Sequence, residues 1–429
     1  MSSNEKSRGF GKKGWMVIIF TLFIYMFTCT AADTLNVSVT AFASAFGWDS
    51  NQMLLFSAVG GFAGIIVSAV LGVVVAKKGV KIPTVVMMVA SALIWLFHGH
   101  VSTFITYGLA VILLTAFSNA LNLVSTQQIM SNWFPKKKGI ALGWATMGTC
   151  FSSAIMVAVF QGMFGKTISA PFNLMCVIFL ILAVITIVWF KQFPEEAGAY
   201  PDNEPITEEE KKANLEMLNN SKTVFTIGKL VRTKEMWMLT VIFGFVALGL
   251  VAVISQMVPR LVAVGLGQNT AIMYLTIASI IGIPASVIWG FIDQKLGTNK
   301  TVRVFCLLWT LMLVVSAIGS GMVSAPIAVF SVIFYAVLLG GMMNLMPSAI
   351  ISVFGRFDFA DANKIIMPLI IGIRSCAFLL VPVTLAAAGP NVNGGFRNAF
   401  IVCAILSAIS TVLAFLLKDQ CIGRNSLDK

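Results

Sequence analysis

Long apolar stretches separated by short polar segments make up most of the chain. Each stretch is about 20 residues long, which lets a helix cross roughly 30 Å of hydrocarbon. Nothing alternates with the period of two that a membrane β-strand requires. We therefore expect an all-α membrane protein with twelve transmembrane helices. The predicted spans start near Trp15, Met53, Ile82, Phe104, Gly139, Pro171, Trp237, Ala271, Arg303, Pro326, Ile365 and Arg397.

One long polar stretch, which contains "FPEEAGAYPDNEPITEEEKK", lies between the sixth and seventh spans. It divides the chain into an N-terminal six-helix bundle (1–190), a connector (191–235) and a C-terminal six-helix bundle (236–429). Thr207 followed by Glu210 is a capping box, which predicts the start of a short surface helix. We expect the connector to have no core of its own.

Composition agrees with a membrane protein, because 58% of the residues are hydrophobic and only 11% are charged. The net charge of +12 comes mainly from lysines and arginines in loops that would share one side of the membrane. The positive-inside rule then places both termini in the cytoplasm, with the protein in the plasma membrane and its basic loops against anionic lipid. These basic residues are spread over separate loops, so they do not predict the continuous basic surface that a nucleic-acid-binding protein needs. The first apolar stretch is too long for a cleaved signal peptide and lacks a clear cleavage site.

The seven cysteines stand singly, mostly inside spans, without the spacing of metal ligands. We expect no disulfide, no metal and no cofactor. His98 and His100 fall in "FHGHVS", which hydropathy places on an outside loop. A pH-sensing or metal-binding role is possible for them, but a solvated loop is the simpler expectation.

The two halves share a motif after their second span: "GVVVAKKGVK" in the first and "GFIDQKLGTNK" in the second. This pattern resembles the loop motif of the major facilitator superfamily, and it implies that family's fold of two six-helix bundles around a central site. The match is incomplete, because the family's acidic residue is Ala76 in the first copy and stands one place early, as Asp293, in the second. The resemblance implies that gating involves Gly72, Lys77, Gly79, Gly290, Asp293 and Gly297.

Two further stretches resemble particular branches of this superfamily. "NWFPKKKGIALGWATMG" (132–148) is similar to the loop before the fifth helix in organic-anion branches of the superfamily. "AADTLNVSVTAF" (31–42) is similar to the first-helix pattern of the anion:cation symporters, with Asp33 and Asn36 kept and Thr34 in place of an arginine. In that family the arginine helps to bind the anion, so another residue must supply the cation here.

Arg374 is our candidate for that cation. It lies in the apolar run "PLIIGIRSCAFLLVPV", and a start of the eleventh helix near Ile365 places it close to the bilayer midplane. An arginine in lipid costs about 3 kcal/mol or more on insertion scales, so it should face a cavity or a partner. The chain also resembles the oxalate:formate antiporter family, which uses a basic residue in helix 11 for a carboxylate. Members that bind dicarboxylates add a cation in helix 8, which this chain lacks, so the resemblance favours a singly charged anion.

Asp33 is the second charged side chain that would be costly to place inside the membrane. With 100° per residue, it shares a polar stripe of the first helix with Tyr25, Asn36 and Thr40. A buried carboxylate can take up a proton near neutral pH, so Asp33 is a candidate for proton coupling. The alternatives are a structural ion pair or a solvated outer helix end.

Several polar residues inside other spans are weaker candidates for lining the substrate cavity. Hydrogen bonds between helices explain most amides within membranes, so each is more often structural than substrate-binding. The further candidates are Asn119, Asn122, Gln256, Tyr335 and Asn344.

These observations favour a secondary transporter that moves a small organic anion, by proton symport or anion exchange, and acts as a monomer. An exporter of amphipathic compounds is the alternative, although "GWATMGTCFSS" in helix 5 lacks the proline that would support it. An enzyme or a sensor is poorly supported, because the sequence contains no nucleotide-binding loop, no zinc-type His-Glu pattern and no appended soluble domain.

Overall fold

The computed structural model describes residues 9–219 and 225–423, and these fold into helices without any strand. Eleven helical segments are long and apolar enough to cross a membrane. The longest, Ala325–Ala388, would extend about 96 Å as a single helix, about three times the hydrocarbon thickness. Its backbone reverses at Gly355, where φ is 72°. This segment therefore crosses twice, and the expected twelve crossings are confirmed in the described part of the chain.

The first six crossings form the N-terminal half, and three of them are built from more than one helical piece. The pieces are α1 (Gly11–Asp33) with α2 (Leu35–Phe46); α3 (Ser50–Lys78); α4 (Lys81–Gly99); α5 (Phe104–Ala120), the π-helix η1 (Leu121–Ser125) and α6 (Thr126–Trp133); α7 (Lys138–Phe151), the π-helix η2 (Ser152–Met156) and α8 (Val157–Phe164); and α9 (Ala170–Val188).

The C-terminal half contains the other six crossings. Its pieces are α12 (Lys234–Ser255) with α13 (Met257–Ala263); α14 (Gln268–Leu296); α15 (Thr298–Gly321); α16 (Ala325–Ser375) with α17 (Ala377–Ala388); and α18 (Val392–Leu416). The tenth crossing is α16 up to Gly355, and the eleventh is the remainder of α16 followed by α17. The eleventh helix thus starts well before the expected Ile365, because a single glycine turns the chain. The other expected starts lie close to the observed ones.

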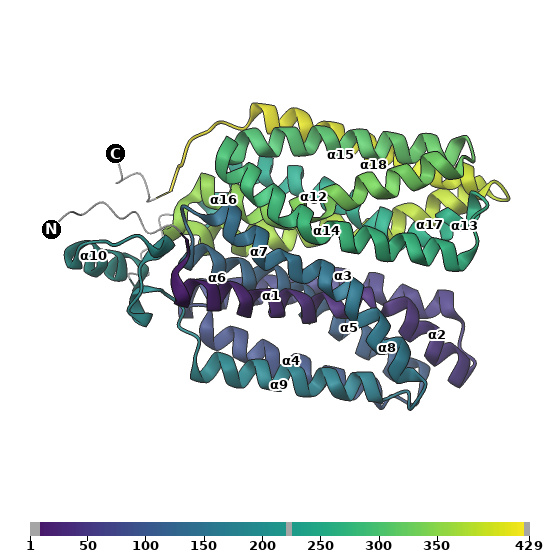
Figure 1. Ribbon diagram of the computed structural model, residues 1–429, viewed down its shortest axis with the longest axis horizontal. Coiled ribbons are helices and arrows are strands. Elements are labelled where there is room, and N and C mark those ends of the chain that lie inside the picture. Colours follow the sequence, from purple (N-terminus) through teal and green to yellow (C-terminus); the bar gives the residue numbers. More distant parts are fainter. Residues whose placement is uncertain (1–8, 220–224, 424–429) are drawn as a thin grey trace.

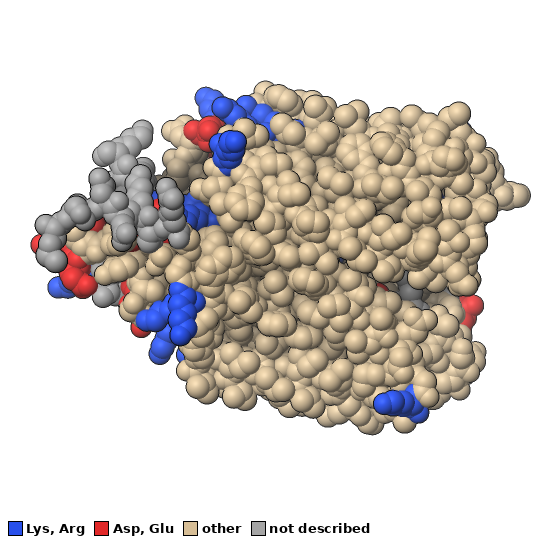
Figure 2. Space-filling model, in the orientation of Figure 1, with Lys and Arg blue, Asp and Glu red and all other residues tan. Residues whose placement is uncertain are grey.

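The two halves lie side by side along the long axis of the molecule (Figure 1). They meet where α7 packs on α14 and where α3 packs on the last part of α16. Gly9 and Gly423, the first and last described residues, lie at the same end as the connector helix α10 (Glu208–Asn219). We call this end the terminal face and the other end the opposite face. Charged side chains gather at the terminal face, and the flanks are almost free of them (Figure 2).

The connector is docked on the terminal face rather than suspended between the halves. Its 3-10 helices η3 (Glu195–Ala197) and η4 (Pro201–Asn203) precede α10, and α11 (Ile227–Val231) precedes α12. Phe193, Phe225 and Leu230 are buried. The capping box is confirmed, because the Glu210 backbone N–H donates to Thr207 Oγ1 (3.1 Å) and Glu210 Oε2 accepts from the Thr207 N–H (2.8 Å). The bonds from Thr207 lower the pKa of Glu210.

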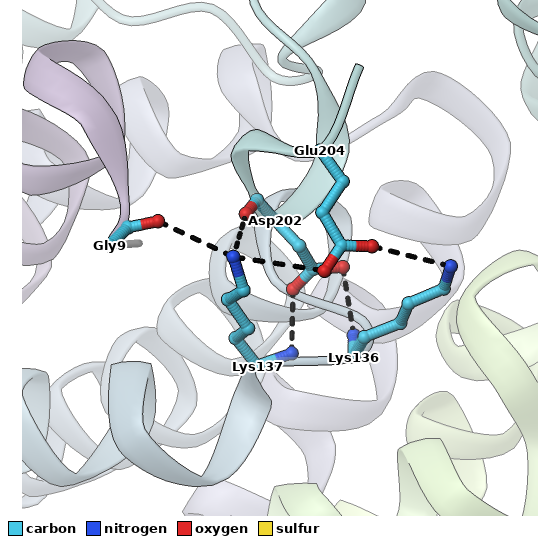
Figure 3. A network of polar contacts seen from close by, with 5 residues as sticks. All are labelled: Gly9, Lys136, Lys137, Asp202 and Glu204. Atoms are coloured by element: carbon cyan, nitrogen blue, oxygen red, sulfur yellow. Dashed lines mark hydrogen bonds and ion pairs between the residues drawn. The ribbon is translucent and has the colours of Figure 1, made fainter. Parts of the chain in front are cut away.

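Asp202 fastens this segment to the start of α7 (Figure 3). Its carboxylate accepts the backbone N–H groups of Lys136 (2.9 Å) and Lys137 (2.7 Å), which precede the first turn of that helix. Lys137 Nζ donates to the Asp202 carbonyl (2.8 Å) and reaches Gly9 O (3.4 Å). Glu204 pairs with the same two lysines. Burial raises the pKa of the Asp202 carboxyl, and the two N–H bonds act in the opposite direction.

Candidate functional site

Five membrane crossings are irregular partway along their length. α1 breaks at Thr34, α12 breaks at Gln256, and the eleventh crossing breaks at Cys376. The fourth and fifth crossings each contain a π-helix, η1 and η2. Such breaks release backbone groups from the helical ladder and are common at ligand sites in transporters. The expected site residues gather at these irregular places: Asp33, Asn36, Asn119 and Arg374 lie within two residues of one, Asn122 lies inside η1, and Gln256 forms a break.

Asp33 ends α1, but α2 continues the same crossing as far as Phe46. The carboxylate is therefore inside the bundle, and the expectation of a solvated outer helix end is wrong. Ser152 and Ser153 of η2 lie beside it. Oδ2 is nevertheless buried without a hydrogen-bond partner among the described residues. A carboxylate oxygen in this position is free to accept a proton or a ligand donor.

Arg374 lies in the last two turns of α16 and is half-buried. It lies near Cys29 of α1, which belongs to the other half of the molecule. Within the described residues it makes no hydrogen bond and no ion pair. Its five N–H donors are therefore available at the interface between the halves.

Arg260 shows what a structural arginine looks like in the same fold. It is 1% exposed and donates to Ser331 Oγ (2.7 Å), Ser320 Oγ (3.1 Å) and the Ser316 carbonyl (3.3 Å). Its guanidinium also lies over the Phe400 ring, 4.9 Å from the centroid. All of these partners belong to the C-terminal half, so Arg260 holds that half together.

Two buried tyrosines lie in the same region as Asp33 and Arg374. Tyr25 of α1 is close to Cys29, and Tyr335 of α16 is close to Asp33 and to Cys150 of α7. Both side chains are at most 1% exposed, and neither hydroxyl has a hydrogen-bond partner in the described structure. Asp33, Cys29, Arg374 and Tyr335 thus bring polar groups from both halves to one region.

The amide candidates separate into different environments. Asn122 of η1 donates to Thr28 Oγ1 (2.8 Å) and to Cys29 Sγ (3.4 Å), so it ties the fourth crossing to α1 beside the charged pair. Asn119, one turn earlier, and Gln256, between α12 and α13, are half-buried. The side chain of Asn36 lies outside the described residues.

Asn344 lies instead in a tightly packed junction near the terminal face. With its amide in the orientation that satisfies both groups, it donates to Gly139 O (3.2 Å) and accepts from Gly290 N (3.0 Å). A Cβ on Gly290 would lie 2.5 Å from Gly139 O, so only glycine permits this approach of α7 and α14. Asp293 adjoins Gly139 and accepts from Ser348 Oγ (2.6 Å).

The first copy of the repeated motif lies at a separate contact between the halves, where α3 packs on the eleventh crossing. Gly72 packs against the backbone of Lys364, where a Cβ would meet Cα at 2.7 Å. Gly79 and Gly297 adopt φ values of 77° and 84°, which favour glycine. Lys77 is exposed.

The sequence did not predict a buried ion pair that lies at the terminal face. Arg356 makes a bidentate contact with Glu195 (2.9 and 3.0 Å), and its Nε donates to the Asn132 carbonyl (2.9 Å). The Glu195 side chain is fully buried and that of Arg356 is 4% exposed. We call this pair the latch, because it joins the turn of the C-terminal half to the connector and to α6. The signal was present, since Arg356 stands in the apolar run "ISVFGRFDF".

At the opposite face the halves are less connected. α2 and α8 pack on the N-terminal half, whereas α13 packs on the C-terminal half. The surface is hollowed between the halves near this end (Figure 2). The two halves are therefore joined mainly toward the terminal face.

His98 is not on a solvated loop, so that expectation is wrong. It lies in α4 and is 3% exposed; its ring stacks on Phe42, with 5.6 Å between the ring centroids, and contacts the tilted Phe172 ring, with 4.6 Å between the centroids. The helix extends one turn further than hydropathy placed it, because these aromatic rings cover the imidazole. His100 follows the helix and is exposed.

The profile described as Major Facilitator Superfamily matches residues 21–366. The chain belongs to this superfamily. It is 24% identical, over 396 residues, to a protein named oxalate:formate antiporter from Oxalobacter formigenes, covering 89% of this chain and 83% of that one. Among solved superfamily structures, it superposes on the proton:xylose symporter XylE with a TM-score of 0.71 at 11% identity, covering 94% of each chain. It superposes on the human organic anion transporter MFSD10 with a TM-score of 0.67 at 11% identity, covering 94% of this chain and 99% of that one.

These similarities confirm the expected major facilitator fold and identify the chain as a multi-pass membrane transporter. In a major facilitator protein the substrate site lies between the two halves, near mid-membrane. Asp33 of α1 and Arg374 of α16 come from different halves.

Proposed function

We propose that this transporter moves a small organic anion across the cell membrane, and that Arg374 binds the anion. The observation that carries this proposal is an arginine without a partner at the interface of the halves, in a fold whose other buried arginines are fully bonded. An intramembrane cation is costly unless it is paired, so an unpaired one is best explained by a ligand that pairs with it.

A monocarboxylate fits the charge of this region better than a dianion. Arg374 is the one cation beside Asp33 in the described site, because Arg260 is engaged with serines of its own half. A dianion would leave a negative charge uncompensated in a region of low dielectric, which is expensive. The similarity to an oxalate:formate antiporter supports a carboxylate ligand.

Asp33 is our proposed proton-coupling group. It is half-buried, its hydrogen-bonding neighbours are neutral serines, and one of its oxygens is unpartnered. Such a carboxylate can alternate between ionised and protonated forms as the site changes its exposure. Proton symport and anion exchange are both compatible with this role.

Transport would proceed by alternating access, with the terminal face in the cytoplasm. The concentration of basic residues at that face supports this orientation and a location in the plasma membrane (Figure 2). We propose that the contacts between the halves near the motif residues Gly72, Gly79, Gly290, Asp293 and Gly297 open when the opposite face closes. Lys77, which is exposed, would lie at the edge of these contacts. We also propose that the transporter acts as a monomer.

The test is anion binding by purified protein. Arg374→Lys should weaken binding, because lysine lacks the fixed fork of donors, and Arg374→Gln should weaken it by about 10- to 100-fold. Arg397→Gln is a matched control, since Arg397 is exposed and its hydrogen bonds go to its neighbour Asn398. Binding is measured by isothermal calorimetry against small carboxylates, on variants that melt close to wild type.

Normal carboxylate affinity in a well-folded Arg374→Gln protein would overturn the anion-site assignment. Binding of uncharged or cationic amphipathic compounds with no carboxylate binding would instead support an exporter of such compounds.

A further inference from the structure

A cavity of about 250 Å³ lies at the terminal face, where the start of α1, the ends of α6 and α9, and η3 of the connector meet. Lys13, Lys191 and Glu196 supply its charged side chains, and the rings of Trp133 and Trp189 supply aromatic walls. We call this cavity the groove. Its lining comes from the N-terminal half and the connector, so the groove is separate from the interface between the halves.

The groove adjoins the lipid-facing surface of α9. Ile187 and Val188, in the last turn of that helix, are 56% and 74% exposed, as expected for side chains that contact lipid tails. Trp189 follows them directly, and Lys191 lies two residues further along the chain. Tryptophan and lysine are typical of the boundary between membrane and water. A headgroup bound in the groove can therefore leave its acyl chains on the surface of α9.

The two lysines of the groove have no anionic partner. Among the described residues, neither of them takes part in an ion pair. Lys13 Nζ donates to the carbonyls of Ala197 and Gly198, which are uncharged. Glu196 accepts from Gln192 Nε2 (3.5 Å), which is also uncharged. With both lysines and Glu196 ionised, the groove carries one net positive charge, which one singly charged anion would balance.

We propose that the groove binds the headgroup of an anionic phospholipid of the phosphatidylglycerol type. Its phosphodiester binds Lys13 and Lys191, and its headgroup hydroxyls donate to Glu196. The groove is smaller than the roughly 300–1,000 Å³ of pockets that enclose a drug-sized ligand, so it suits a headgroup whose tails stay outside. Basic residues next to a membrane attract anionic lipids in particular.

The groove shares two segments with the latch. Glu196 of η3 lines the groove, and the preceding residue, Glu195, makes the bidentate contact with Arg356. Trp133 of α6 lines the groove, and the preceding carbonyl, that of Asn132, accepts from Arg356 Nε (2.9 Å). A headgroup that holds η3 beside α6 therefore stabilises the arrangement in which the latch is formed. This coupling is reciprocal, so loss of the latch should weaken lipid binding.

The experiment is native mass spectrometry of the purified full-length protein in detergent, with dioctanoyl phosphatidylglycerol as the probe. Lys13→Gln and Lys191→Gln should each weaken binding about fivefold, the effect of removing one surface charge next to an anionic lipid. Lys12→Gln is the matched control, because Lys12 is exposed beside Lys13 but does not line the groove. An equal effect of all three changes would assign the lipid to the basic surface in general and overturn the site.

Lys191→Gln also guards against misfolding. The Lys191 side chain makes no hydrogen bond within the described residues, and its carbonyl, which accepts from Trp133 Nε1 (3.1 Å), is kept. Unchanged lipid binding in this variant would overturn the site even if Lys13→Gln unfolds.

Three further probes test the chemistry of the ligand. Phosphatidylethanolamine and phosphatidylcholine with the same tails carry no net charge, and glycerol 3-phosphate has no tails. Each should bind about fivefold or more weakly than phosphatidylglycerol. Equal binding of either zwitterionic lipid would overturn the charge argument, and equal binding of glycerol 3-phosphate would replace the lipid by a soluble phosphate.

The coupling to the latch has its own test. Arg356 does not line the groove, yet Arg356→Ala should weaken phosphatidylglycerol binding severalfold in the folded protein. Unchanged binding in this variant would overturn the coupling.

Discussion

Two arginines in the same half illustrate how one residue type serves two purposes. Arg260 and Arg374 are both inside the helix bundle, but Arg260 is surrounded by three oxygen acceptors and an aromatic ring, and Arg374 has none of these. The sequence shows both as a cation in an apolar run. Only the side chains of neighbouring helices decide which cation is saturated and which is free to bind.

Asp33→Asn tests coupling at the level of a single proton. An amide cannot take up or release a proton, so substrate-driven proton uptake should disappear in proteoliposomes, while exchange between two loaded sides should continue. A pH-sensitive dye inside the vesicles reports the proton, and labelled substrate reports exchange. Unchanged proton uptake would assign Asp33 a structural role.

Cys29 offers a direct probe of the charged pair. It is half-buried and lies near Asp33 and Arg374, whereas Cys150 is fully buried. In a variant whose other cysteines are replaced, a small anionic thiol reagent should modify Cys29 from the opposite face, and a bound carboxylate should slow the reaction. Arg374→Gln should abolish this protection. Protection that persists in the variant would place the ligand elsewhere.

Among the structural elements, the connector has one part that is docked on the helix bundle and one part that is exposed to solvent. Residues 193–204 are docked, with Asp202 accepting two backbone N–H groups at the start of α7. The solvent-exposed start of α10 follows them. Shortening "DNEPITEEEKK" would remove both parts at once. We therefore expect uptake in vesicles to survive a shortened connector only if Asp202 is kept.

Asp202→Ala should therefore destabilise the protein, while Glu216→Ala on exposed α10 should not. Loss of the carboxylate strands two backbone donors, which costs about 1–3 kcal/mol. A lowered melting temperature for Asp202→Ala alone, measured by intrinsic fluorescence in detergent, is the expected result. Equal melting temperatures for the two variants would show that the bonds from Asp202 contribute nothing to stability.

Helix positions were readable from the sequence, but helix contacts were not. Hydropathy places the spans well because every membrane helix must be apolar over a fixed length. It misplaced the start of the eleventh helix and the environment of His98, since one glycine turn and one aromatic cluster decide them. The Glu195–Arg356 latch joins residues 161 positions apart, and no local pattern marks such a pair.

At the scale of the whole molecule, the latch and the glycine junction hold the halves together on the terminal face. Breaking one partner of a buried ion pair is costly, because the other charge is left uncompensated. Arg356→Ala should therefore disfavour the closed terminal face and raise the population of molecules in which it is open.

Spin labels at Lys77→Cys and Lys295→Cys, two exposed positions in different halves, measure this change in a background without other cysteines. The distance distribution should gain a longer component in Arg356→Ala. Replacing Glu195 and Arg356 together by Met removes both charges and should have a smaller effect on stability than the single change. An unaltered distribution in Arg356→Ala would exclude the latch from gating.

The π-helices η1 and η2 carry an implication for how the site arose. A π-bulge fits one additional residue into a helical turn, and one residue corresponds to a rotation of about 100°. Because the bulge takes up that residue within one turn, an insertion of one codon beside Asn122 or Ser152 would leave the flanking turns on their original faces and would change only the side chains that the bulge itself presents. Related transporters that lack the extra residue should therefore align with a gap of one residue at this turn and differ there in the side chains that face the neighbouring helices, while the flanking turns keep their contacts.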